Sequence, residues 1–317
     1  LQTDTKFKLM FLRAVRYDAK KAARRMVNYF EQKGALFGEE KLVKRITISD
    51  LSQQDMQVFC SGFSILLRRN DQAGRPVYFY DVDKLDLLRL PAESYLRCLW
   101  YQAMASMADE IAQRKGMSAI QYFGNPDFSM PGSIRKVTDL FLSHGHMLNH
   151  CLPCRFSSFH VCYENPRMSF FLQTLRVAVG RDTRLRIRTH LGSDMENEYF
   201  LLTFGIRCDQ LLQKSRLGNL EAIQEYVERR RSADRKDEES ERDSEARSGI
   251  VAYPQLNDVL VGRGLPFREY SGNTPWTSLI STHLEKYQQC SAFEKTIISM
   301  DVVKTVKDSG SRFLERR

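Results

Sequence analysis

The hydrophobic pattern at the start of the chain predicts two amphipathic helices. Between residues 6 and 33, apolar side chains recur at spacings of three and four residues, which gathers them on one helical face. Asp18 is suited to cap the second helix, and Gly34 is suited to end it. The apolar positions are Phe7, Phe11, Val15, Ala19, Ala22, Ala23, Met26 and Phe30.

Beyond these helices the pattern changes to strands that alternate with helices. Residues 63–81 contain two apolar runs around turn-forming residues, which predicts a hairpin-like pair of strands. One long helix is predicted from Pro91, with Leu96, Leu99 and Ile111 on its inner face. A strand "MSAIQYF", a helix over about 133–150, a strand "SSFHVCY" and a helix after Pro166 follow. This order favours an α/β fold with a largely parallel sheet.

An alternation of basic and apolar residues closes this region. Arg184, Arg186 and Arg188 alternate with Leu185 and Ile187, and a period of two predicts a strand with one basic face. That face could bind an anion. It could equally solvate an edge strand, because charges on such strands block pairing with other chains.

A charged segment separates this lobe from a smaller unit. Residues 228–248 have almost no apolar side chain and nearly balanced charge, so they cannot form a core. We therefore predict a flexible or helical linker over residues 216–250 and a small, mainly α-helical unit over 251–317. That unit begins with "NDVLVGRGLPFREYSGN", and Ser291 and Glu294 form a capping box for its second helix. It resembles an uncharacterised small domain common in diatom proteins.

Charge and cysteine content narrow the classes of partner and compartment. The 317 residues carry a formal net charge of +9, which favours nucleic acid, an anionic membrane or a phosphorylated ligand as partner. Seven cysteines, scattered along a chain with no recognisable secretory leader, are typical of free thiols in a reducing compartment. We expect a cytoplasmic protein that meets membranes only at their surface, since no run of apolar residues is long enough to span one.

Three segments resemble the CRAL-TRIO, or Sec14-like, lipid-binding family. "FLRAVRYDAKKAARRMVNYFEQK" resembles its helical lead-in, and "NDQAGRPVYFYDVDKL" is similar to its Asp-x-x-Gly-Arg-Pro-Val turn into a strand. "CLPCRFSSFHVCYENPRMSFFLQTLRVAVGRDTRLRIRTHLG" resembles its Tyr-Pro-x-Arg strand, its Asn-x-Pro turn and its basic strand closing in a glycine. The matched positions are Asp71, Gly74, Arg75, Pro76, Val77, Pro153, Arg155, Asn165, Pro166, Arg186, Ile187 and Gly192.

The resemblance implies a helical N-terminal part (residues 1–45) and a lipid-binding lobe (46–215) whose sheet floors an apolar cavity. It places a headgroup-binding role on Arg186, with Arg155 and Arg188 as neighbours and Ser118 as a further ligand residue. Arginine suits phosphate because its planar fork donates two hydrogen bonds. It also implies a gate helix near 133–150 with membrane-facing residues Val137, Leu140, Phe141, Met147 and Leu148.

The expected function is therefore to bind a lipid and to transfer it between membranes or present it, without catalysis, cofactor or metal. The lipid is a phosphoinositide or another hydrophobic small molecule. Cys154 stands where many members have an acidic residue, which leaves a sterol-like, tocopherol-like or retinoid-like ligand open. The expected partners are the lipid and an anionic membrane surface.

Two other interpretations compete with this one. "HGHMLNHCLPC" concentrates imidazoles and thiols, which zinc prefers, but no second Cys-x-x-Cys or His pair follows at a finger-like distance. In the C-terminal unit a basic end could bind nucleic acid, although acidic residues interleave with it, as in an interaction module. The bases concerned are Lys304, Lys307, Arg312, Arg316 and Arg317.

Overall fold

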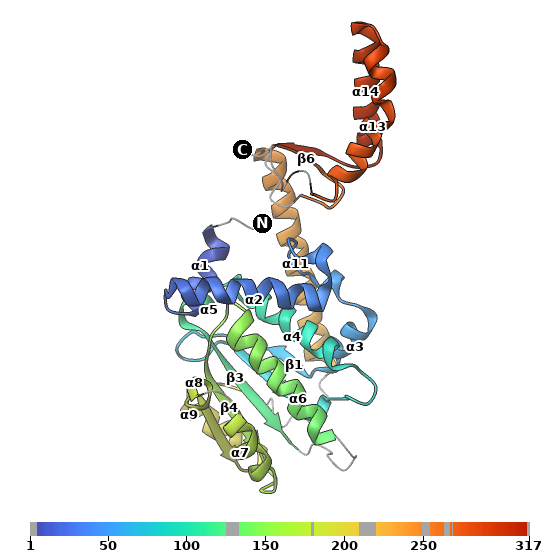
Figure 1. Ribbon diagram of the computed structural model, residues 1–317. Helices are drawn as coiled ribbons and strands as arrows, with labels where there is room; N and C mark the ends of the chain where they lie inside the picture. The colour runs from blue at the N-terminus through green and yellow to red at the C-terminus, as the bar shows by residue number, and fades with distance from the viewer. Residues whose placement is uncertain are drawn as a thin grey trace. The chain divides into compact units, whose positions relative to one another are not determined.

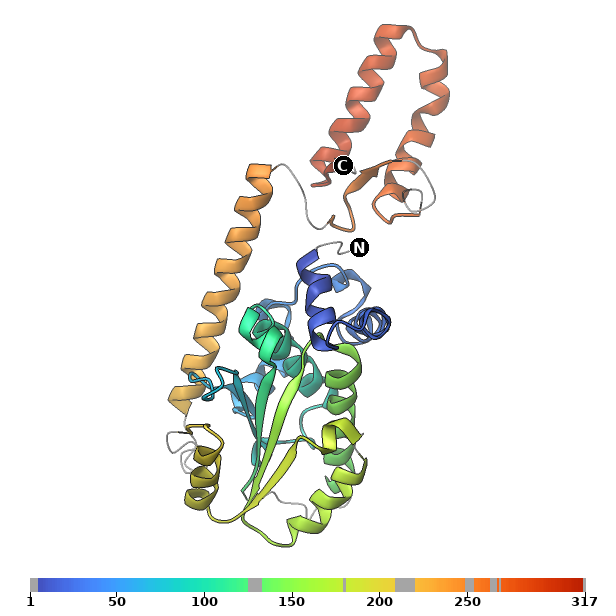
Figure 2. The same cartoon turned by 90° about the vertical axis from the view of Figure 1, so that its left-hand side faces the viewer.

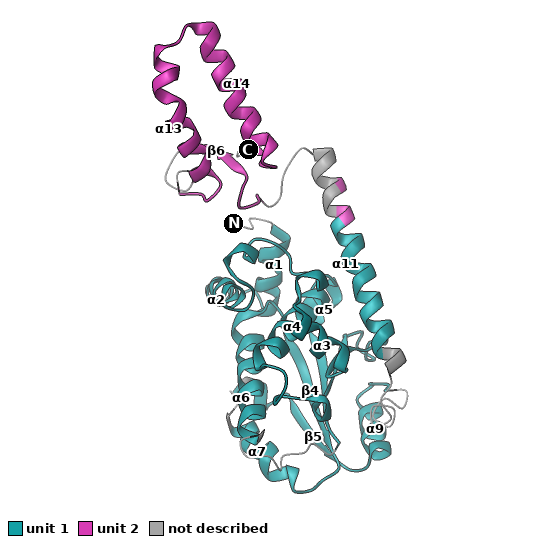
Figure 3. Cartoon of the chain, turned by 90° about the vertical axis from the view of Figure 1, so that its right-hand side faces the viewer, with its two compact units in different colours: residues 1, 3–238 teal, residues 2, 239–317 magenta. Residues whose placement is uncertain are grey.

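The chain forms two compact units that divide between Glu238 and Glu239, within the charged segment (Figure 3). The computed structural model describes residues 5–124, 133–178, 181–208, 220–248, 254–262, 267 and 269–315. The first unit is mixed α/β with a mainly parallel sheet, and the second is mainly α-helical, as predicted.

The N-terminal helices form as their apolar spacing predicts. Helices α1 (Thr5–Ala14) and α2 (Ala19–Phe37) bury Phe7, Phe11 and Tyr29 in the largest core cluster. The carboxylate of Asp18 accepts a hydrogen bond from the Lys21 amide and caps α2. Short turns η1 (Glu39–Lys41) and η2 (Ile48–Asp50) and helix α3 (Gln53–Ser61) follow.

Five strands form the sheet of the first unit in the order β1-β2-β3-β4-β5. The predicted hairpin is confirmed, because β1 (Ser64–Leu66) pairs antiparallel with β2 (Val77–Asp81). The remaining strands are parallel: β3 (Met117–Phe123), β4 (Phe156–Tyr163) and β5 (Ile187–Leu191).

The single long helix predicted after Pro91 is wrong. After the η3 turn (Val82–Lys84), the chain forms two separate helices, α4 (Ala92–Ser106) and α5 (Glu110–Lys115). Asp109 starts α5 because its carboxylate accepts from the Ile111 amide at 2.8 Å. Ile111 is consequently 45% exposed instead of lying in the core.

Helices cover both faces of the sheet (Figures 1 and 2). One face carries α6 (Ser133–His146), which continues into the π-helical turn η4 (Met147–Cys151), and α7 (Met168–Ala178). The opposite face carries α9 (Asp194–Thr203), whose Leu201 packs with Phe79, Ile120 and Cys162. We call these the α6 face and the α9 face.

The arginine-rich strand begins later than its alternation predicts. Residues Arg181–Arg184 form one helical turn, α8, and the amide of Arg186 bonds to the carbonyl of Thr183. Leu185 is 74% exposed, so its apolar side chain does not pack in the lobe. The prediction is therefore wrong for residues 184–186, and only Ile187 and Arg188 of the run enter β5.

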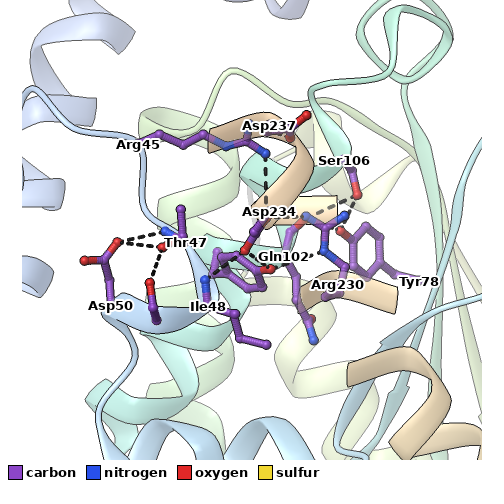
Figure 4. A network of polar contacts seen from close by, with 12 residues as sticks. Arg45, Thr47, Ile48, Asp50, Tyr78, Gln102, Ser106, Arg230, Asp234 and Asp237 are labelled. Carbon is purple, nitrogen blue, oxygen red and sulfur yellow. Dashed lines mark hydrogen bonds and ion pairs between the residues drawn. The ribbon is translucent and has the colours of Figure 1, made fainter. Parts of the chain in front are cut away.

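The charged segment is one helix, α11 (Leu220–Ser248), and its first half belongs to the core of the first unit. Tyr226 and Val227 are buried, and the Tyr226 ring stacks on Phe59 with centroids 5.5 Å apart. Further along, Asp234 is buried in a polar network with residues 45–48 and with Tyr101 (Figure 4). The predicted linker thus includes part of the folded lobe.

The second unit combines a two-stranded parallel ladder with two helices. Strands β6 (Val259–Val261) and β7 (Phe313–Glu315) pair, and α13 (Asn273–Gln289) contacts α14 (Ala292–Asp308). The predicted capping box of Ser291 and Glu294 is confirmed. At Gly272 a Cβ atom would lie 2.0 Å from the Asp258 carbonyl oxygen, so only glycine fits there.

Candidate ligand-binding cavity

A mainly apolar cavity of about 80 Å³ lies between the α6 face of the sheet and the helices that cover it. Strands β3, β4 and β5 form its floor, because alternate residues of each strand point to the same side. Its walls come from α6, η4, α7 and α8. The lining residues are Gln121, Phe123, Phe141, Leu142, His144, Gly145, Leu148, Asn149, Phe159, Val161, Leu172, Leu175, Arg176, Thr183, Ile187 and Thr189.

Among the residues that line the cavity, His144 is a buried polar side chain with an unsatisfied hydrogen-bonding atom. It is 5% exposed, and its ring packs edge-on against Tyr80 with centroids 5.6 Å apart. Its Nε2 atom is buried and has no hydrogen-bond partner. Burial lowers the pKa of His144 to about 3, so the imidazole is neutral at physiological pH.

The other polar side chains of the lining are all more exposed than His144: Gln121, Asn149, Arg176, Thr183 and Thr189. Asn149 is exposed, and its amide donates to the Gly145 carbonyl at 2.8 Å. The Thr183 hydroxyl donates to the Asn149 side-chain oxygen at 3.3 Å. Arg176 on α7 is half-buried. Sequence reasoning missed Arg176, although its position four residues after Leu172 places both on one helical face.

The five predicted gate residues face the interior of the lobe. Val137, Leu140, Met147 and Leu148 are buried, and Phe141 is half-buried against the cluster around Phe123. Phe141 and Leu148 line the cavity. A bilayer would reach these side chains only if α6 left the sheet, so their contact with a membrane stays a prediction.

The four predicted ligand residues do not line the cavity, and the structure separates them into two groups. Ser118 lies on the α9 face, where its hydroxyl donates to the Asp71 carboxylate at 3.0 Å. The same carboxylate accepts from the Arg75 amide and guanidinium, which closes the predicted turn. Arg188 also lies on the α9 face, with its guanidinium 5.2 Å from the centre of the Phe204 ring.

Arg155 and Arg186 lie together at the end of the sheet where β4 and β5 begin. Arg155 donates to the Arg114 carbonyl at 2.8 Å and Arg186 to the Phe156 carbonyl at 3.0 Å. Burial and the nearby charges of Arg16 and Arg186 lower the pKa of Arg155. Burial, and to a smaller extent the charge of Arg186, lower the pKa of Arg25 as well. We call Arg16, Arg25, Arg155 and Arg186 the arginine cluster. The Arg155 Nε atom is buried there without a partner.

The structure does not combine the five residues of the zinc interpretation into one metal site. These residues are His144, His146, His150, Cys151 and Cys154. The rings of His146 and His150 are 5.1 Å apart, whereas His144 packs on Tyr80. Within the described ranges, no group of three or more His, Cys, Asp or Glu residues could hold a metal ion. Burial raises the pKa of Cys151, and that of Cys154 to about 12, which is opposite to what a thiolate ligand or nucleophile needs.

One residue of the basic end predicted for the C-terminal unit, Arg312, forms an ion pair inside that unit. The Arg312 guanidinium donates to both oxygens of the buried Asp258 carboxylate, at 3.1 and 2.8 Å. Lys304 and Lys307 are exposed, and Arg316 and Arg317 lie outside the described residues. In the part of the chain that the structure describes, no helix is long and apolar enough to cross a membrane.

Comparison with known proteins gives a weak structural likeness and a family match for the C-terminal residues. No curated protein matches the chain, and no CRAL-TRIO family model does. A crystal structure of Sfh5, a Sec14-family protein, is similar with a TM-score of 0.42 and 10% identity, over 59% of this chain. The similarity spans 63% of that chain. Residues 258–317 match the family described as a domain of unknown function, DUF6824.

Proposed function

We propose that the first unit binds a lipid or another hydrophobic small molecule in the cavity between the sheet and α6–α7, and presents it or transfers it between membranes. The observation that carries the proposal is the cavity itself. It is lined mainly by apolar and aromatic side chains with a few polar groups, which is the usual make-up of a small-molecule site. The role is binding, without a catalytic step.

Ligand binding on this scale requires the cavity to enlarge. Sites for drug-sized ligands have volumes of about 300–1,000 Å³, whereas this cavity measures about 80 Å³. Since α6 and α7 form the wall opposite the sheet, their outward movement would enlarge it. That movement would also expose Val137 and Leu140, which the sequence predicts to be membrane-facing residues of a gate helix.

The arginine cluster supports a second part of the proposal, which is contact with an anionic surface. Three of its guanidinium groups, those of Arg25, Arg155 and Arg186, donate to main-chain carbonyls of the lobe. Guanidinium groups keep their charge and can bind phosphate. We therefore place the contact with an anionic membrane or headgroup at Arg155 and Arg186, at the end of the sheet, whereas Arg188 lies on the α9 face.

Filling the cavity is expected to reduce lipid uptake strongly. The test is native mass spectrometry of the full chain and uptake of a fluorescent phospholipid or sterol from vesicles. Leu172→Trp should reduce uptake at least tenfold, because Leu172 is buried and lines the cavity. The matched control is Val177→Trp on the same helix, where the side chain is 69% exposed. An empty wild-type protein that takes up neither probe would refute the proposal.

Removing two members of the arginine cluster is expected to weaken binding to anionic vesicles. A basic residue near a charged membrane surface contributes about 1 kcal/mol, so Arg155→Ala combined with Arg186→Ala should reduce affinity by about ten- to thirtyfold in a vesicle sedimentation assay. Arg188→Ala should leave it nearly unchanged. If Arg188→Ala had the larger effect, the membrane-facing surface would lie on the α9 face.

A further inference from the structure

The cavity contains a hydrogen-bonding group for which the protein provides no partner. His144 lines the cavity, is 5% exposed, and leaves Nε2 buried and unpaired. A buried polar atom without a partner costs about 1–3 kcal/mol, so such atoms in native proteins call for an explanation. Its ring packs against Tyr80, and Phe141 and Leu148 of the same helical segment line the cavity with it.

We propose that His144 is the polar anchor of the ligand, and that the ligand is an uncharged apolar molecule with one hydroxyl group, such as a long-chain or alicyclic alcohol. This inference rests on the proposed function, since it concerns the same cavity. A neutral imidazole has one donor and one acceptor nitrogen. A hydroxyl both donates and accepts, so it can bind Nε2 in either tautomer, whereas an ether or ester oxygen can bind only the donor form.

The charge of the site favours an alcohol over a fatty acid. His144 is neutral because burial lowers its pKa to about 3, so it provides no positive charge for a carboxylate. Transferring an unpaired carboxylate into an apolar site is very costly. The cation in the lining is Arg176, which is half-buried. A fatty acid would thus place its head at Arg176 and would leave His144 unpaired.

The experiment compares three six-carbon probes that fit a small cavity: 1-hexanol, n-hexane and hexanoate. Affinities for the full chain are measured by ligand-detected NMR at pH 7.5. His144→Phe keeps the aromatic contact with Tyr80 and removes the hydrogen bond, while His144→Gln restores donors and acceptors. The matched control is His146→Phe, at the exposed histidine two residues later.

The expected result is a loss specific to the alcohol. An uncharged hydrogen bond contributes about 0.5–1.5 kcal/mol, so His144→Phe should weaken hexanol binding about two- to twelvefold and leave hexane binding unchanged. His144→Gln should recover part of the loss, and His146→Phe should have no effect. Without ligand, His144→Phe should unfold at the same temperature as wild type or higher, because it removes an unpaired polar atom.

Different failures have different meanings. If hexane and hexanol both bind but His144→Phe weakens them equally, the cavity binds apolar molecules and the anchor role is wrong. The same conclusion holds if hexanoate binds best and depends on Arg176, or if His144→Phe strongly destabilises the unliganded protein. If none of the probes, nor any lipid, binds the wild type, the proposed function itself fails.

Discussion

Replacing Asp234 by alanine is expected to destabilise the first unit by about 3–5 kcal/mol, because it leaves buried donors without an acceptor. Asp234 is 3% exposed and lies on the half of α11 that packs against the lobe. One carboxylate oxygen accepts from the Ile48 amide at 2.8 Å and from the Tyr101 hydroxyl at 2.7 Å. The other accepts from Arg230 at 3.0 Å.

These contacts connect three distant parts of the chain (Figure 4). The Arg230 guanidinium also donates to the Tyr101 hydroxyl at 3.2 Å and lies over the Tyr101 ring. Without the carboxylate, the Arg230 guanidinium, whose side chain is only 14% exposed, loses the opposite charge with which it pairs. The loss should therefore exceed that of an ordinary hydrogen bond, which is about 1 kcal/mol.

Asp237→Ala is the matched control. Asp237 lies one turn further along α11 and pairs with Arg45 at 2.6 Å, but its side chain is 45% exposed. Exposed ion pairs contribute at most about 1 kcal/mol. Both variants would be measured by urea unfolding, followed by Trp100 fluorescence in a Trp276→Phe background, so that only the first unit is observed. Equal stability of the two variants would contradict the role assigned to Asp234.

Periodicity was sufficient to predict the fold class, because it reflects which residues are buried in each element. The N-terminal helices follow from spacings of three and four residues, the hairpin of β1 and β2 from two apolar runs around turn residues, and the parallel sheet from the alternation of strands and helices. Where the structure differs from the predicted elements, local hydrogen bonds set the boundaries of the elements. Asp109 divides the helix after Pro91, and a helical turn replaces the start of the arginine strand.

The cavity could be predicted only in part. The sequence indicated its walls, since Phe141 and Leu148 of the predicted gate helix line it. The sequence could not indicate which polar residues lie on the face of the sheet that forms the cavity floor. Ser118 and Arg188 lie on the α9 face, and the unpaired nitrogen of His144 is a property of packing between elements distant in sequence.

Mild acid is expected to destabilise the first unit, because buried histidines with lowered pKa values remain neutral in the folded state. Burial lowers the pKa of His144 to about 3, and burial together with His190, Arg188 and Arg75 lowers that of His160 to about 3, against the opposing charge of Asp71. His160 Nδ1 and His190 Nε2 share a hydrogen bond of 3.1 Å between stacked rings, and the pKa of His190 is lowered too.

The direction follows from the protons bound in each state. An unfolded histidine binds a proton below a pH of about 6.5, whereas folded His144 and His160 do so only near pH 3. Between these values the unfolded state holds more protons, so stability falls as the pH falls. The loss is about 1.4 kcal/mol per pH unit for each histidine, or about 2 kcal/mol each between pH 7 and pH 5.

Comparison of variants at pH 7 and pH 5 isolates this effect. Asp50 and Asp55 have lowered pKa values, so their contribution is lost only in stronger acid, below a pH of about 4. His144→Phe combined with His160→Asn should remove most of the pH dependence, because neither new side chain titrates and asparagine can still hydrogen-bond His190. His146→Asn, at an exposed position, should keep the wild-type loss of about 4 kcal/mol. An unchanged pH dependence in the double variant would mean that other groups take up the protons.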